Sequence, residues 1–165
     1  MKFIIGILIF ALVFIIGFII IAGISFDINI GQHLKRAADA NTLKLAQDEL
    51  KQALQVIELR NLKEGNTSIL IPAPSNDLDF WYKNLKASLG ELDLALANTK
   101  MSQLEQSNVL MKLRETLLDD GGESLSVTCP AYVSMHPYQK IIFVLVIIII
   151  LGMIAAFLYG MAHEF

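Results

Sequence analysis

The 165-residue chain has few residues that carry chemistry, with one cysteine and three histidines. One thiol excludes an internal disulfide framework and a multi-thiolate metal site. His33, His136 and His163 lie far apart, and none has a second His or a Cys at the spacing of a zinc site. A glycine-rich phosphate loop and a Gly-x-Ser-x-Gly nucleophile motif are also missing. These absences predict a protein that is not an enzyme, with no catalytic residue, metal or cofactor.

Charge is also scarce, because only 18% of the residues are Asp, Glu, Lys or Arg. From Ser25 to Lys140 the chain has 12 Lys or Arg against 15 Asp or Glu, a net charge of −3. Proteins that bind nucleic acid present a basic face to the phosphates, and this balance is slightly acidic. The sequence therefore predicts no nucleic-acid partner.

Two long apolar runs stand at the ends of the sequence, Phe3 to Ile24 and Ile141 to Ala162, and neither contains a formal charge. As a helix each would be roughly 33 Å long, enough to cross a bilayer core. A cleaved signal peptide and a removable lipid-anchor signal are the alternatives, although the first run exceeds the usual apolar stretch of a signal peptide. We expect a transmembrane anchor at 1–25, and a transmembrane helix with a short tail at 140–165, in a lipid bilayer.

Small residues mark candidate helix-packing faces in both runs. Gly152, Ala156 and Gly160 recur every four residues, a spacing that lets a second helix approach closely. Gly6 and Gly17, eleven residues apart, fall on nearly one face of the first run. The two spans can pack on each other or on helices of another membrane protein, including a second copy of this chain.

The orientation of the spans depends on their flanking charges. The positive-inside rule compares short flanks, and the 116-residue segment between the spans is too long for its total charge to count. A charged start at Lys2 followed by a long apolar run is typical of a cytoplasmic N-terminus. We expect both termini in the cytoplasm and the central segment outside it, in a plasma membrane; a cytoplasmic central segment is the alternative.

Between the spans, apolar residues recur every three or four positions, which is the spacing of amphipathic helices. The clearest stripe consists of Leu43, Ala46, Leu50, Ala53 and Ile57. Ser102 and Glu105 form a capping box before the last of these stretches. The domain is predicted at 26–139. Its predicted helices cover about 32–63, 77–98 and 102–119.

Three antiparallel helices would leave the chain at the end of the domain far from the membrane. We therefore expect residues 123–139, which include Pro130 and Pro137, to return in an extended conformation. The β-prone segment Thr67 to Ile71 is a possible partner strand for this return. The predicted fold class is an all-α membrane protein, in which two transmembrane helices flank a three-helix antiparallel bundle with an extended return segment.

Two features of the central domain are candidates for binding. Phe80, Trp81 and Tyr82 are consecutive, so on a helix they spread over about 200° and not all of them fit one buried face. They form a possible partner patch, with a core anchor as the alternative. Cys129 is a possible intermolecular thiol outside the cytoplasm, or else a free thiol that is simply buried.

Three segments resemble a group of small, uncharacterised bacterial membrane proteins with a helical loop domain. They are Lys35 to Thr42, Phe80 to Ser88 and Asn108 to Leu118, within a resemblance that covers about 35–118. The resemblance implies a bacterial source, and hence an inner membrane. It implies no activity, cofactor or site residue.

Together these features predict a non-enzymatic integral membrane protein, either an accessory or structural subunit or a protein-interaction subunit of an envelope or membrane complex. The first alternative is a helical module that senses a ligand. The tails have no room for an output domain, so such a module would signal through a separate membrane partner. The second alternative is a phage-encoded membrane protein that acts in lysis.

Overall fold

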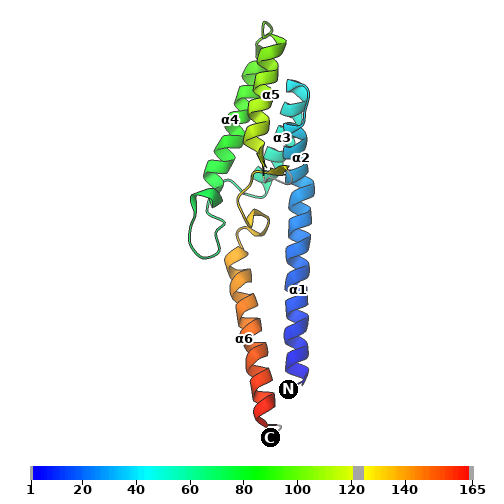
Figure 1. The fold of residues 1–165 in the computed structure, drawn as a ribbon, viewed down its shortest axis with the longest axis vertical. Coiled ribbons are helices and arrows are strands. Elements are labelled where there is room, and N and C mark those ends of the chain that lie inside the picture. Colours follow the sequence, from blue (N-terminus) through cyan, green and yellow to red (C-terminus); the bar gives the residue numbers. More distant parts are fainter. Residues whose placement is uncertain (1, 121–124, 164–165) are drawn as a thin grey trace.

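The computed structural model describes residues 2–120 and 125–163, most of which are helical (Figure 1). Two long apolar helices extend from one end of a helical domain, and the start of the first lies near the end of the second. The α-helices are α1 (Lys2–Phe26), α2 (Gln32–Ala38), α3 (Leu43–Leu59), α4 (Leu78–Ala97), α5 (Gln103–Leu117) and α6 (Gln139–His163). The short elements are β1 (Leu118–Asp120), β2 (Leu125–Val127), the π-helical turn Asp27–Gly31 and the 3-10 turns Pro74–Asn76 and Val133–Met135.

Two helical segments are long and apolar enough to span a membrane, Phe3–Ala38 and Gln139–Ala162. The first does not end near residue 25, where the predicted anchor ends. It passes through the π-helical turn directly into α2, so the apolar helix and the first helix of the domain are one continuous rod. A tilt of α1 would therefore move α2 with it.

The predicted helix at 32–63 is wrong in one respect, because the structure divides it into α2 and α3. Thr42 has an extended backbone, and its hydroxyl accepts a hydrogen bond from the Leu45 amide at 3.3 Å, which starts a new helix. The second helix ends at Leu59 rather than 63. Asn61 adopts a left-handed conformation, and the Leu62 amide donates back to the Ile57 carbonyl at 2.9 Å, a common helix stop.

The domain is therefore a bundle of four helices rather than three. Contacts join α2 to α3, α3 to α4, α4 to α5 and α5 to α2, so the four helices form a closed ring, and α3 also contacts α5 across it. With an even number of helices, α5 itself brings the chain back toward the apolar helices (Figure 1).

The predicted long extended return is correspondingly wrong. Its residues 123 and 124 lie outside the described part of the chain. The remainder holds the three-residue strand β2, a 3-10 turn and the start of α6. Strand β2 pairs antiparallel with β1, with Leu118 opposite Val127, and not with Thr67 to Ile71. The third predicted helix accordingly ends at Leu117, and β1 begins at Leu118.

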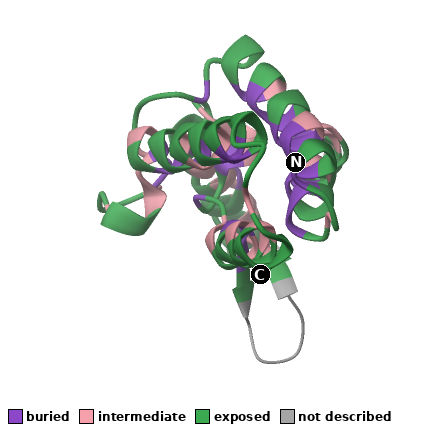
Figure 2. Ribbon diagram, turned by 90° about the horizontal axis from the view of Figure 1, so that it is seen from above, coloured by how far each residue is buried: buried purple, intermediate pink, exposed green. Residues whose placement is uncertain are grey.

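The core lies between the four helices, where Figure 2 shows buried residues on the faces that the helices turn toward one another. The predicted apolar stripe of α3 is confirmed, because all five of its members are buried. They are Leu43, Ala46, Leu50, Ala53 and Ile57. From α4, Leu78, Leu85 and Leu92 complete the core, together with Leu113 and Leu117 of α5.

Candidate functional site

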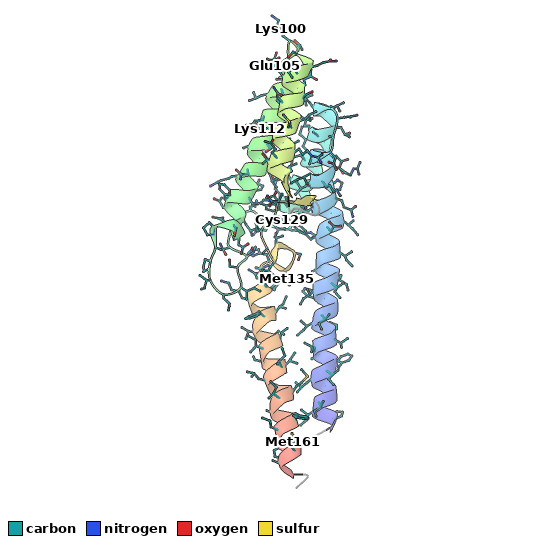
Figure 3. The ribbon with its side chains drawn as sticks, in the orientation of Figure 1. Lys100, Glu105, Lys112, Cys129, Met135 and Met161 are labelled. Atoms are coloured by element: carbon teal, nitrogen blue, oxygen red, sulfur yellow. The ribbon has the colours of Figure 1, made fainter. Side chains whose placement is uncertain are left out.

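An open pocket of about 520 Å³ lies where α4 begins, against the segment 128–131. Phe80, Trp81 and Cys129 all line it. The structure thus brings two of the three candidate aromatics together with the candidate thiol. Figure 3 shows Cys129 in the region where the helical domain meets the apolar helices, so the pocket lies toward the end of the domain from which these helices extend.

The three consecutive aromatics have three different environments. Trp81 is buried, and its indole Nε1 donates to the Thr128 carbonyl at 3.0 Å, which attaches the 128–131 segment to α4. Phe80 is exposed beside the pocket. Tyr82 lies outside the pocket, and its hydroxyl donates to Glu58 of α3 at 2.7 Å. Trp81 therefore has the anchoring role, and Phe80 is the member of the triplet available to a partner.

The walls of the pocket are fixed by side-chain hydrogen bonds. Asp77 caps α4 by accepting from the amides of Asp79 at 2.9 Å and Phe80 at 3.3 Å. The Asn76 side-chain oxygen Oδ1 accepts from the Ala131 amide at 3.0 Å, which joins the two sides of the pocket. A pocket held in this way needs little reorganisation to receive a ligand or a side chain.

Cys129 is an exposed residue and lines the pocket. Loss of water around the sulfur raises the pKa of Cys129, and the nearby carboxylate of Asp119 raises it further. Both effects disfavour the thiolate, which is the reactive form of cysteine. At neutral pH the thiol is therefore protonated and a poor nucleophile.

We expect Cys129 to react slowly with iodoacetamide at neutral pH. Its alkylation rate should rise only at a higher pH than the rate of an ordinary surface thiol. The control is a cysteine at the exposed Leu104 in a Cys129→Ser background. The measurement is the alkylation rate across an alkaline pH series, followed by mass spectrometry. Equal pH profiles for the two thiols would contradict the raised pKa.

The candidate helix-packing residues divide into two groups. A Cβ added to Gly152 would lie 3.4 Å from Leu8, so α6 packs on α1 at this point. Within the described residues, a Cβ added to Gly6 or Gly17 would have no neighbour within 4 Å. Gly6 instead lies in an open hollow of about 440 Å³ between Phe3 and Phe10.

The contact between α1 and α6 follows a spacing of three and four residues, as in a coiled-coil seam. The less exposed residues of α1 include Ile5, Leu8, Leu12, Ile15, Ile19, Ala22 and Phe26. Those of α6 include Ile142, Val146, Ile149, Met153, Ala156 and Gly160. Ala156 and Gly160 thus lie on the same partly covered face of α6 as Gly152.

Sequence reasoning missed a polar cluster between α2 and α3. The carboxylate of Glu49 is buried, and it lies 2.7 Å from His33 Nδ1 and 2.5 Å from an Arg36 guanidinium nitrogen. In a single helix from 32 to 63 these groups would be far apart, so only the break before Thr42 brings them together. Among the described residues no three His, Cys, Asp or Glu side chains are grouped as a metal site.

No family model, curated protein or solved structure matches this chain. The resemblance to small bacterial membrane proteins therefore stays a prediction. The structure defines the protein by its architecture, a mostly helical chain with two long apolar helices and a helical domain between them.

Proposed function

We propose that the chain is a two-pass integral membrane protein that acts by binding a partner. The observation that supports this proposal is the exposed apolar surface of α1 and α6. Phe10, Phe14 and Phe157 are each more than half exposed, although the two helices contact each other. Lipid would cover such a surface at little cost, whereas water would not.

The proposed membrane is a bacterial inner membrane, with both termini in the cytoplasm and the helical domain outside it. The chain runs out along α1 and back along α6, which supports a common side for the two tails (Figure 1). A Lys2→Cys variant in the Cys129→Ser background tests the orientation. We expect a membrane-impermeant maleimide to label it only after the cells are permeabilised, and labelling of intact cells would contradict the proposal.

The proposed role is that of an accessory, structural or protein-interaction subunit of a membrane or envelope complex. The pocket beside Phe80 supports it, because an exposed aromatic ring next to a preformed apolar wall suits the anchor residue of a partner. Asp119 lies in the same pocket, so we expect the bound segment to combine apolar side chains with a basic one. The position of the pocket suits a partner in the same membrane.

Purification in mild detergent tests this role. We expect the full chain to retain a specific membrane protein that a Phe80→Ser variant loses. Leu94→Ser is the matched control, because Leu94 is an exposed residue of the same helix and does not line the pocket. A monomer without any retained protein in several detergents would contradict the proposal, as would equal behaviour of the two variants.

The pocket also supports the second candidate, a ligand-sensing module. Its volume of about 520 Å³ is in the range of small-molecule sites. A metabolite that raises the melting temperature of the full chain, and fails to do so for Phe80→Ser, would favour sensing over partner binding. Absence of any such ligand from a broad metabolite screen would count against it.

A further inference from the structure

The loop between α3 and α4 presents an apolar tip at the end of the domain that faces the apolar helices. Leu70 is 76% exposed and Ile71 is 81% exposed, and the exposed Pro72 follows them. Leu59, the last residue of α3, is 78% exposed at the same end of the bundle. Contiguous exposed apolar residues of this kind are typical of a contact surface.

The loop behind this tip is held in place. Ser68 is buried, and its hydroxyl accepts from the amide of Ala73 at 3.1 Å and from the Asn76 side chain at 3.0 Å. The Asn66 side chain donates to the Ala73 carbonyl at 2.9 Å, which closes the loop at its base. The conformation of the loop therefore keeps Leu70 and Ile71 on the outside.

The base of the loop is attached to the first turn of α6. The Gln139 side chain donates to the Asn66 carbonyl at 3.3 Å, and Gly65 lies against the His136 ring. Figure 1 shows that the loop descends to the level at which α6 begins. The apolar run of α6 starts at Ile141, so the tip of the loop and the apolar surface of α6 begin at one level.

Two further features lie at the end of the domain from which the apolar helices extend. Arg60, next to the end of α3, donates to the Ser25 hydroxyl at 3.0 Å, where the apolar run of α1 ends. Tyr138 is exposed immediately before α6, and tyrosine favours the boundary between lipid and water. Polar side chains of the domain thus lie beside the ends of both apolar runs.

We propose that Leu70 and Ile71 insert into the interfacial layer of the bilayer that α1 and α6 span. The occupant of this surface is lipid because the tip lies at the level at which the apolar surface of α6 begins. The inference rests on the proposed function, since it needs the two helices in a membrane. A third contact beside α1 and α6 fixes the tilt of the domain over the membrane, and with it the position of the pocket beside Phe80.

Site-directed fluorescence in vesicles tests the insertion. Single cysteines at Ile71, Leu104 and Phe157 in the Cys129→Ser background carry an environment-sensitive dye on the full chain, reconstituted in phosphatidylcholine and phosphatidylglycerol. We expect the dye at 71 to have blue-shifted emission and to lose intensity when spin-labelled lipid is added. Leu104, 71% exposed, lies at the start of α5 near the far end of the bundle, and a dye there should keep its intensity.

The dye at Phe157, on the exposed surface of α6, separates failure of the inference from failure of the proposed function. If 157 is quenched by lipid while 71 behaves like 104, the helices are in the membrane and the loop insertion is overturned. If neither 157 nor 71 is quenched, the proposed membrane function itself fails. A dye at 71 that is shielded from both lipid quencher and aqueous iodide is covered by protein, which also overturns the inference.

Discussion

Replacement of Leu50 by alanine is expected to lower the free energy of unfolding of the helical domain by about 3 kcal/mol. Leu50 is fully buried on α3, and α3 contacts α2, α4 and α5. Truncation removes apolar contacts and leaves a cavity at the centre of the ring. Four helices already share this centre, so none of them can move inward to fill the cavity without losing its other contacts.

The matched control is Leu45→Ala, the same substitution on the same helix at a residue that is 44% exposed. We expect it to change stability by less than about 1 kcal/mol, because little buried surface is lost. Denaturation of the full chain in detergent, followed by the fluorescence of the single tryptophan Trp81, measures both variants. Equal losses for Leu50→Ala and Leu45→Ala would contradict the four-helix core.

Local patterns in the sequence predict the helices of this domain well. The stripe of α3 is buried at every predicted position, because a spacing of three and four residues places side chains on one face. The capping box is also confirmed. The Ser102 hydroxyl accepts from the Glu105 amide at 3.3 Å, and the Glu105 carboxylate accepts from the Ser102 amide at 2.7 Å. Both signals depend only on residues a few positions apart.

The break between α2 and α3 escaped prediction because the apolar pattern continues across it. Leu34 and Ala38 before the break and Leu43 after it are all buried, so periodicity alone indicates one helix. The deciding interaction is the cap at Thr42, which competes with helix continuation. Without this break the domain has three helices, an odd number, and the chain ends far from the apolar helices. The long extended return is then needed to bring the chain back to them.

The candidate site could be predicted only as separate residues. Phe80 and Cys129 stand out in the sequence by type, but their common pocket depends on the hydrogen bond between Trp81 and Thr128, 47 positions apart. The contact face between α1 and α6 was visible on α6 only, where Gly152, Ala156 and Gly160 mark it. Both runs are apolar on all sides, so no pattern of polar and apolar residues distinguishes the face on α1, and Gly6 and Gly17 do not mark it.

Replacement of Gly152, on the contact face of α6, by leucine is expected to destabilise the packing of α6 on α1 by about 2 kcal/mol. A Cβ at residue 152 already comes within 3.4 Å of Leu8, so the larger side chain must push the two helices apart. Ala155→Leu is the control, since Ala155 is exposed on α6 and has room for a larger side chain. Thermal unfolding of the full chain in lipid nanodiscs measures both variants.

The face of α6 that contains Gly152, Ala156 and Gly160 packs either on α1 or on a helix of another protein, and the two cases predict different results in this experiment. If Gly152 serves the contact with α1, Gly152→Leu lowers the melting temperature of the chain alone, and Ala155→Leu leaves it unchanged. If the face serves a helix of another protein, Gly152→Leu leaves the isolated chain as stable as Ala155→Leu does and removes the co-purifying protein. The distance to Leu8 favours the first result. A partner helix would then pack elsewhere. The hollow at Gly6, on the exposed side of α1, leaves room for such a helix between Phe3 and Phe10.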